Sequence, residues 1–502
     1  MPLIINFRRD RRAWVRTQGQ GIDEASFRRH AQKMLKTFIE LGPSYIKLGQ
    51  WLSTRADMMP LPYLEELAKL QDDVPPSDFE SVRPIIESEL GRIDVVFDSF
   101  NTKPLSGASL GQVFLARYMN RDVIVKVSRP NIEERVERDI YVMQRIVPLA
   151  TRFIDPNLRF SAEGMLSQFI ETVHEEMDYR IEAQNLLAIK NNLKDDPDVV
   201  IPAVFLERSS RHVLTMEYVP GIKITDVAAL DAMGVDREKL VVRVHRLFFK
   251  MLLRHEIFHA DPHPGNISVS DTGAIILYDF GMVGRLDEQT RLRLIRLYLA
   301  LVEKNPQRTV SILMELGTLE YNVNRFFVEK AVDMSIQSLY GKQVDKMEVK
   351  ALMELANKTM SRFPFRLPKN LALYMRMASI LEGIYLHHKV NFQFVKVLAD
   401  LLKEEGLVRQ AYIEEAKIYV GRIAKGIESA ITLAPMLQQS LQEISGAERK
   451  KSNDPALPGA ILAAGLFVGS SLLMPYSPLL AYGGIAGACA TVAIILLNKK
   501  KS

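Results

Sequence analysis

The residues with the clearest chemical meaning form two short motifs, His259-Ala-Asp-Pro-His-Pro-Gly-Asn266 and Asp279-Phe-Gly281. An Asp with an Asn five positions later, followed by a hydrophobic strand that ends in Asp-Phe-Gly, is typical of a site that holds Mg-ATP for phosphoryl transfer. We predict that Asp261 is the catalytic carboxylate and that Asn266 and Asp279 hold Mg²⁺, which prefers oxygen ligands. Either motif alone is equally typical of a turn, but their order and separation disfavour that alternative.

The elements that position such a site in a protein-kinase-like fold include a hairpin with a lysine. Two short strands, Phe114–Arg117 and Val123–Val127, are joined by the polar turn Asn120-Arg-Asp122, which is the pattern of a β-hairpin. Lys126 on the second strand is predicted to contact the α- and β-phosphates of ATP. A single lysine in a valine-rich strand is more often an edge residue, so this prediction depends on its position relative to the preceding loop.

That loop differs from the glycine-rich loop of ordinary kinases. It keeps Gly111 and Val113 but has Ser106 and Ala108 at the first two glycine positions. Replacing glycine removes backbone freedom, so we expect a stiffer cover over the nucleotide. The predicted nucleotide-binding residues of the loop are Leu105, Ser106, Gly107, Ala108, Ser109, Leu110, Gly111, Gln112 and Val113.

Two further segments are predicted to complete the site. Residues Glu171–Asn185 have the composition of a helix that supplies an acidic partner for Lys126, although charge-rich helices are usually only solvated faces. His212–Gly221 is predicted to be a strand that ends in a Pro-Gly break between two lobes. Glu217 and Val219 are expected to offer backbone groups to adenine.

Several motifs together resemble those of the UbiB/aarF-domain (ABC1/ADCK) family of atypical kinases, in particular a bacterial UbiB-like member. They are Lys47-Leu-Gly-Gln50, Pro104–Val113, Glu176-Met-Asp178, Glu182–Asn185 and His259–Asn266. The resemblance implies that Glu176 is the catalytic helix glutamate facing Lys126, and that an N-terminal extension covers the place of a peptide substrate. The residues implied to gate the site are Lys47, Gln50, Asp178 and Glu182.

The same resemblance implies a function. It implies binding of ATP and Mg²⁺, with hydrolysis coupled to a membrane lipid or a precursor of ubiquinone or a related isoprenoid quinone. Quinone-biosynthesis enzymes are its implied protein partners. Two alternatives stay open: a membrane-tethered protein kinase, and a non-catalytic nucleotide-gated scaffold for a lipid-biosynthetic complex.

The N-terminal extension is predicted to be helical from the residues alone. Apolar residues recur at helical spacing over Ala25–Leu41, Gly42-Pro-Ser44 interrupts the pattern, and a second helix follows with Ser44 as its cap. Lys47 and Gln50 lie three residues apart and therefore share one face of this second helix. Without the family resemblance, Lys47 would be interpreted as an ordinary surface lysine.

Composition excludes several classes of protein. The 502 residues contain one cysteine, Cys489, which excludes an intramolecular disulfide. A formal net charge of +5 is small for this length and predicts no nucleic-acid partner. The basic residues near the N-terminus suit either anionic lipid headgroups or a solvated tail, and Met1–Phe7 is too short for the core of a signal peptide. Those basic residues are Arg8, Arg9, Arg11, Arg12 and Arg16.

The C-terminal part contains a long apolar stretch. Residues 287–443 are predicted to be mostly helical and 445–455 to be a polar linker, after which 44 residues, 455–498, lack any Asp, Glu, Lys, Arg or His. One membrane span takes about 20 apolar residues, so two spans are predicted, at 456–474 and 479–497. Lysines and arginines flank both ends, which predicts a hairpin with its ends on the cytoplasmic side of a bacterial inner membrane. Glycines at a spacing of four suit a tight hairpin or a homodimer contact.

The sequence thus predicts an α+β, atypical protein-kinase-like fold with two lobes, a helical N-terminal extension, a helical C-terminal region and a C-terminal transmembrane hairpin. The predicted boundaries are 1–95 for the extension, 96–220 for the N-lobe, 221–444 for the C-lobe with its helical region, 445–455 for the linker, and 456–497 for the membrane helices.

Overall fold

The computed structural model describes residues 2–17, 21–53, 59–70, 77–107, 109–154, 159–319, 323–340, 369–390, 392–418, 420–421, 423–425, 463, 470 and 485–489. The chain divides into two compact units, Met1–Glu405 and Gly406–Ser502, and every element discussed below belongs to the first. The whole of the predicted linker, and all but a few residues of the two predicted membrane spans, lie outside the described residues. Within the described part of the chain, no helix has the length and apolar character needed to cross a membrane.

The smaller lobe is built on an antiparallel sheet in the order β1-β3-β4-β6, with β2 also paired to β3. The predicted hairpin is confirmed, with Val113 opposite Lys126, but its turn is shifted: Met119 and Asn120, with φ angles of 49° and 60°, form the turn, while Arg121 and Asp122 belong to β4. Positive φ at both central residues gives a turn whose twist matches that of the strands. The strands are Ser99–Phe100 (β1), Ser106–Gly107 (β2), Gly111–Tyr118 (β3), Arg121–Ser128 (β4) and Val213–Glu217 (β6).

Helices α5 (Phe79–Leu90) and α6 (Ile93–Val96) cover one face of this sheet. Phe79, Val82 and Ile86 are buried against the inward side chains of β3 and β4, among them Phe114 and Val125. Burying large apolar side chains on one face fixes the register of the strands, because a shift of one residue would expose them. The register in turn places Lys126 toward the space between the lobes.

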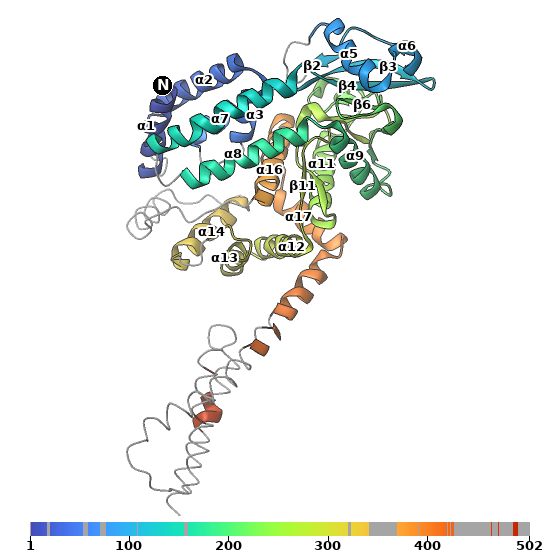
Figure 1. The fold of residues 1–502 in the computed structure, drawn as a ribbon. Helices are drawn as coiled ribbons and strands as arrows, with labels where there is room; N and C mark the ends of the chain where they lie inside the picture. Colours follow the sequence, from blue (N-terminus) through green and yellow to red (C-terminus); the bar gives the residue numbers. More distant parts are fainter. Residues whose placement is uncertain are drawn as a thin grey trace, which may run out of the picture. The chain divides into compact units, whose positions relative to one another are not determined.

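The N-terminal helices pack beside the long helix α7 (Ile132–Ile154) (Figure 1). They are Pro2–Thr17 (α1), Glu24–Leu41 (α2), Pro43–Leu52 (α3) and Leu61–Leu67 (α4). The predicted break between α2 and α3 is confirmed, since Gly42 has a φ of 99°. The prediction that Ser44 caps α3 is wrong: Gly42 occupies the cap, Pro43 lies in the first turn, and the Ser44 hydroxyl donates to Asp139 at 2.5 Å.

The acidic segment 171–185 is not the single helix that was predicted. It contains the end of α8 (Arg159–Glu176) and the start of α9 (Tyr179–Asn192). The Asp178 side chain accepts a hydrogen bond from the backbone N–H of Arg180 at 3.0 Å, which caps α9. A capping Asp stabilises a new helix start, so the chain changes direction between Glu176 and Glu182.

The larger lobe follows β6 in the chain, except for β5, which precedes β6; it contains two small sheets, and its main described helices line or support the site (Figure 1). One sheet has the order β5-β10-β9-β7 and the other pairs β11 with β8. The strands are Val199–Val200 (β5), Ile222–Lys223 (β7), Ile257–His259 (β8), Ile267–Val269 (β9), Ile275–Leu277 (β10) and Val283–Arg285 (β11). The helices are Arg237–Arg254 (α11), Glu288–Val302 (α12), Pro306–Glu315 (α13), Arg325–Leu339 (α14), Lys369–His388 (α16) and Phe394–Glu404 (α17).

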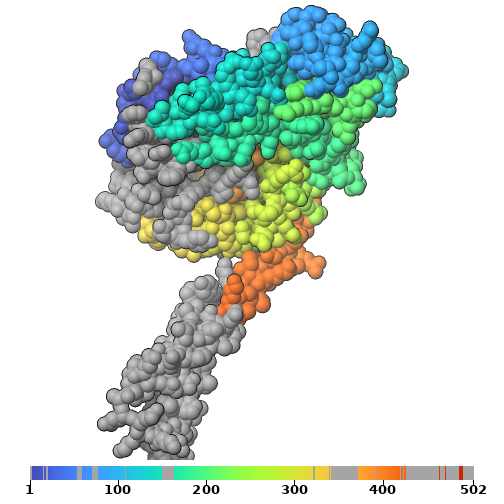
Figure 2. Space-filling model, in the orientation of Figure 1, coloured from blue at the N-terminus to red at the C-terminus, as the bar shows by residue number. Residues whose placement is uncertain are grey.

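The two-lobed α+β arrangement predicted from the sequence is therefore confirmed for this unit. Short elements join the main ones: Leu206–Arg208 (η2), Val227–Ala232 (α10) and Pro264–Asn266 (η3). In the space-filling view, α7 connects the surface of the N-terminal helices with that of the smaller lobe (Figure 2). The predicted helical character of residues 287–443 holds over α12, α13, α14, α16 and α17, while 320–322, 341–368 and 426–443 lie outside the described residues.

One ion-pair cluster joins α5, α7 and the start of β6. The His212 ring contacts Glu89 through Nδ1 and Glu133 through Nε2, the latter at 3.1 Å, and Arg211 also pairs with Glu133 at 2.8 Å. Partial burial lowers the pKa of His212, but the two carboxylates outweigh this effect and raise the pKa above its usual value. The cluster ties the two helices to the sheet most strongly when His212 is protonated.

This cluster predicts a pH dependence of stability. A histidine whose pKa is raised on folding contributes its full stabilisation below its unfolded pKa of about 6.5, and that contribution is lost as the pH rises through the folded pKa. We expect the thermal unfolding midpoint of the wild type to fall between about pH 6 and pH 8 more steeply than that of His212→Gln. Equal slopes for the two proteins, measured by circular dichroism, would contradict the role given to His212.

Candidate active site

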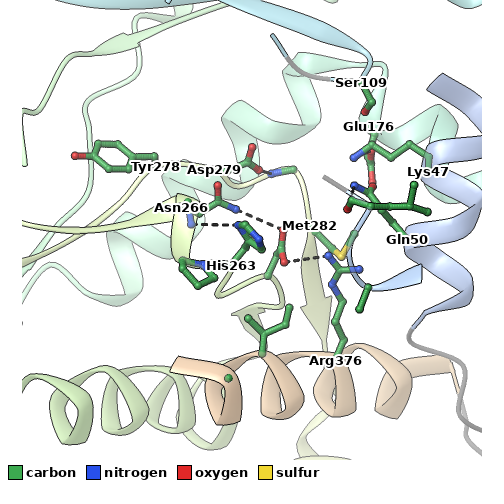
Figure 3. A pocket seen from close by; sticks show the side chains of 18 of the residues that line it. Lys47, Gln50, Ser109, Glu176, His263, Asn266, Tyr278, Asp279, Met282 and Arg376 are labelled. Carbon is green, nitrogen blue, oxygen red and sulfur yellow. Dashed lines mark hydrogen bonds and ion pairs between the residues drawn. The ribbon is translucent and has the colours of Figure 1, made fainter. Parts of the chain in front are cut away.

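A cavity of about 1580 Å³ lies between the two lobes and contains most of the predicted site residues (Figure 3). Its walls come from the loop before β3, from β4, from α3 and α4, from the segments around Asp261 and Asp279, and from α16. Pockets for one small ligand are usually about 300–1,000 Å³. The cavity therefore has room for more than one ligand.

Lys126 lies between two carboxylates. Its Nζ is 2.5 Å from Oε1 of Glu182 on α9 and 3.2 Å from Oδ2 of Asp279, two residues after the end of β10. The Glu182 carboxylate also accepts a hydrogen bond from the backbone N–H of Phe280 at 3.2 Å. One buried glutamate thus holds both the strand lysine and the segment that carries Asp279.

The charges of these groups depend on one another. Burial lowers the pKa of Lys126, but Asp279 and Glu182 outweigh it and raise the pKa above its usual range. Removal from water raises the pKa of the Asp279 carboxyl. The positive charge of Lys126 and the backbone N–H of Gly281 outweigh this effect and hold the pKa at about 2. Burial is the largest influence on Glu182 and raises its pKa. We conclude that Lys126 is an ammonium and Asp279 a carboxylate at neutral pH.

The predicted pairing of Glu176 with Lys126 is wrong. Glu176 ends α8, and its Oε2 is 2.8 Å from Nζ of Lys47 on α3. Glu182 has the place beside Lys126 instead, because the break at Asp178 separates α8 from α9. Asp178 caps α9 and pairs with Arg180 rather than lining the cavity.

Lys47 and Gln50 both line the cavity, as their shared helix face predicted. The Gln50 amide also donates to the backbone carbonyl of Leu70 at 3.2 Å, which links α3 to the residues after α4. Figure 3 places Lys47, Gln50 and Glu176 together on one side of the cavity, beside Ser109 of the loop. The N-terminal helices therefore form part of the wall of the site.

His259 links the segment around Asp261 with the Asp279-Phe-Gly281 motif. Its Nε2 donates to the backbone carbonyl of Asp279 at 2.5 Å, and its Nδ1 accepts the backbone N–H of Asp261 at 3.2 Å. Burial lowers the pKa of His259, so the ring is neutral, as this donor and acceptor pattern requires. Phe280 packs edge-on against the ring at 5.4 Å, and its carbonyl accepts from Asn185 of α9 at 3.1 Å.

Asp261 has a partner that the sequence did not indicate. Its Oδ1 is 3.0 Å from Nη2 of Arg376 on α16, and its Oδ2 accepts from the Asn266 amide at 3.4 Å. Figure 3 shows Arg376 extending from its helix into the cavity. Since 115 residues separate Arg376 from Asp261, no spacing rule could have found the pair.

The loop before β3 lies over the cavity, and seven of its nine predicted residues line it: Leu105, Ser106, Ser109, Leu110, Gly111, Gln112 and Val113. Gly107 in β2 is not among the lining residues, and Ala108 lies outside the described residues. A side chain at Gly111 would come within 2.1 Å of the Tyr179 hydroxyl, so only glycine fits there. Within the described part of the chain, the buried Ser109 Oγ and Gln112 Nε2 have no hydrogen-bond partner.

The predicted adenine contacts are only partly supported. Val219 lines the cavity, together with Met216 and Tyr218. Glu217 does not: its backbone N–H donates to the carbonyl of Ala203 at 2.7 Å, and its carboxylate accepts from the Ala203 N–H at 3.0 Å. Glu217 is thus not a lining residue and its backbone N–H is already bonded to Ala203, so the predicted contact of this backbone group with adenine is not supported.

The side chains present fit the binding of Mg²⁺. Asp279 and Asn266 both line the cavity, and they offer a carboxylate and an amide oxygen, the ligand types this ion prefers. The Asn266 amide nitrogen points to Asp261, which leaves its Oδ1 as the atom for a metal. Among the described residues there is no cluster of three or more acidic, histidine or cysteine side chains for a different kind of metal centre.

Comparison with known proteins identifies similar chains. A sequence model of one family, described as "ABC1 atypical kinase-like domain", matches residues 69–313. The Synechocystis protein sll1770 is 34% identical over 373 residues, which cover 74% of this chain and 64% of that protein. The Arabidopsis thaliana protein ACTIVITY OF BC1 COMPLEX KINASE 8, chloroplastic, is 32% identical over 419 residues, covering 76% of this chain and 55% of that protein. The chain thus spans less than two thirds of the length of these relatives.

A solved structure is also similar, the complex of Rv3197 with erythromycin from Mycobacterium tuberculosis. It has a TM-score of 0.49 and 25% sequence identity to this chain, and it covers 68% of this chain and 87% of that one.

Proposed function

Because this chain belongs to the ABC1 atypical kinase-like family, we propose that it binds Mg-ATP between its lobes and transfers or hydrolyses the γ-phosphate. The observation that carries this proposal is the set of charged groups around Lys126. Lys126 pairs with Glu182 and Asp279 at 2.5 and 3.2 Å, and Asp261 and Asn266 line the same cavity. This is the arrangement that phosphoryl transfer requires, since catalysis depends on positioning and on charge stabilisation.

Each side chain has a defined task in this proposal. Lys126, held by Glu182, contacts the α- and β-phosphates. Asp279 and Asn266 hold Mg²⁺, which neutralises phosphate charge when bound. Asp261 orients the attacking oxygen and accepts its proton. Val219 and the neighbouring residues of the segment between the lobes contact adenine.

The acceptor we propose is a lipid or lipid-like molecule of isoprenoid-quinone metabolism rather than a peptide. The support is that α3 and α4 form part of the cavity wall, through residues such as Lys47, Gln50 and Leu64. A protein kinase needs an open surface where an extended substrate can lie beside Asp261. The apolar stretch 455–498 supports a further proposal, that a membrane hairpin keeps the site near a bilayer.

Labelled ATP tests this function and separates it from its alternatives. Wild-type protein incubated with γ-labelled ATP, Mg²⁺ and lipids from its native membrane should release labelled phosphate or label a lipid. Asp261→Asn should lower this turnover by about a hundredfold or more, because the attacking oxygen loses its proton acceptor. Label appearing only in protein would favour a protein kinase. Tight binding of ATP without turnover would favour a scaffold.

A further inference from the structure

One aromatic side chain connects the segment between the lobes with the segment that carries Asp279. Tyr278 immediately precedes Asp279, and its hydroxyl donates a hydrogen bond to the backbone carbonyl of Val219 at 2.9 Å. Tyr278 and Val219 both line the cavity. Figure 3 shows the Tyr278 ring extending away from Asp279. The residue proposed to hold the metal and the residue proposed to contact adenine are therefore joined through Tyr278.

The Tyr278 hydroxyl is a donor at neutral pH. Burial raises the pKa of Tyr278 above its usual value, although the Ser268 hydroxyl acts in the opposite direction. A tyrosine hydroxyl carries a single proton, and here that proton is donated to the Val219 carbonyl. Any ligand group that donates to this carbonyl would have to share it with the hydroxyl. The acceptor at Val219 is thus already in use before a nucleotide binds.

The donor at Val219 has no such partner. Among the described residues, no acceptor lies within hydrogen-bond distance of its backbone N–H. The N–H groups of Glu217 and Tyr218 donate instead to backbone carbonyls elsewhere in the chain, at 2.7 and 3.0 Å, and Pro220 has no N–H. The segment between the lobes therefore offers a base one backbone donor, at Val219, while the carbonyl of the same residue is occupied.

Purine bases differ at the ring edge that such a donor meets. N1 of adenine is an acceptor, whereas N1 of guanine and of hypoxanthine carries a hydrogen and donates. Adenine can pair with the Val219 N–H, but the other two bases would place one donor against another. A site whose polar groups match one base discriminates strongly against an analogue that leaves them unpaired. Guanine and hypoxanthine would need the Val219 carbonyl, which Tyr278 holds.

We propose that Tyr278 is a specificity-determining residue: its hydroxyl occupies the Val219 carbonyl and thereby selects nucleotides whose purine has a bare N1, adenine over guanine or hypoxanthine. The proposal rests on the function proposed above, since it concerns the base of the same nucleotide. Tyr278 acts through Val219 and needs no contact with the phosphates or with the reacting atoms.

The test first compares three nucleotides on the wild-type full chain with Mg²⁺, by isothermal titration calorimetry. Inosine triphosphate has the ribose and phosphates of ATP but a hydrogen on N1, so it should bind at least roughly tenfold more weakly than ATP. Purine riboside triphosphate lacks the amino group of ATP but keeps the bare N1. It should bind more tightly than inosine triphosphate, which separates the effect of N1 from that of the amino group.

The second part removes the hydroxyl. Tyr278→Phe keeps the ring and frees the Val219 carbonyl, which can then accept the N1–H of hypoxanthine. The preference for ATP over inosine triphosphate should fall by roughly tenfold, mainly through tighter binding of inosine triphosphate. Tyr118→Phe is the matched control, because Tyr118 is also buried and donates from its hydroxyl, to Glu207 at 3.3 Å, but does not line the cavity. It should keep the wild-type preference.

The outcomes separate this proposal from the function on which it rests. Equal binding of ATP and inosine triphosphate by the wild type, or an unchanged preference in Tyr278→Phe, would overturn the role of Tyr278 and leave nucleotide binding intact. Equal loss of affinity for both nucleotides in Tyr278→Phe would also overturn it, because the tyrosine would then only support the fold. Failure of the wild type to bind any of the three nucleotides would overturn the proposed function together with the selectivity.

The unfolding midpoint of Tyr278→Phe, measured by circular dichroism, establishes whether this variant is folded. If it is not, the wild type decides the proposal, and equal binding of purine riboside triphosphate and inosine triphosphate would overturn it.

Discussion

Replacing Asp279 with Asn should lower Mg-ATP turnover by roughly a hundredfold or more, because the charged oxygen that we propose as a metal ligand, and that faces Lys126, becomes neutral. The change keeps the size of the side chain, and an amide oxygen can still accept from the backbone N–H of Gly281, now 3.0 Å from Oδ1. The wild-type carboxyl, with a pKa of about 2, is charged over the whole neutral range. Its loss should thus have the same effect at pH 6 and at pH 8.

A binding measurement distinguishes the metal role from a general loss of activity. Wild-type protein should bind ATP more tightly with Mg²⁺ than with EDTA, and this difference should shrink in Asp279→Asn. Asp271→Asn is the matched control, because Asp271 is an exposed residue in the turn between β9 and β10 and does not line the cavity. Unchanged hydrolysis in Asp279→Asn would contradict the role assigned to this carboxylate.

The parts of the site that the sequence predicted well are those set by local structure. The Asn120 turn fixes the β3–β4 hairpin, and the hairpin places Lys126 opposite Val113. The apolar strand β10 leads to Asp279, and the loop after β8 carries Asp261 and Asn266. All three residues line the same cavity. Such features depend on alternation, turn residues and short separations, all of which can be recognised in one sequence.

The parts that failed depend on how distant segments pack. The composition of residues 171–185 favours helix throughout, and only the capping geometry of Asp178 reveals that two helices meet there. Arg376 carries no local signal, because α16 reaches Asp261 through tertiary packing. The prediction for Glu217 failed because its backbone N–H already pairs with the carbonyl of Ala203, a contact that only the packing of the chain before β6 reveals.

The contrast between Glu182 and Glu176 gives the second large expected effect. Glu182→Gln should lower the affinity for Mg-ATP and the turnover together by roughly ten- to a hundredfold, since Lys126 loses its buried partner. The amide can still face Lys126 with its oxygen, but without charge it no longer offsets the cost of burying the ammonium. The lysine is then drawn more strongly to Asp279, at 3.2 Å, which removes that carboxylate from metal binding.

Glu176→Gln should have a much smaller effect on ATP affinity, because Glu176 pairs with Lys47 at 2.8 Å rather than with Lys126. Glu175→Gln is the matched control: the neighbouring glutamate is exposed and does not line the cavity, so its replacement should change neither affinity nor turnover. If Glu176→Gln lost ATP affinity while Glu182→Gln kept it, the two glutamates would have the roles that the sequence first suggested. The observed ion pair between Glu182 on α9 and Lys126 on β4 would then belong to the protein without ATP, and ATP binding would replace it. The order of the two effects therefore decides which glutamate supports the lysine during turnover.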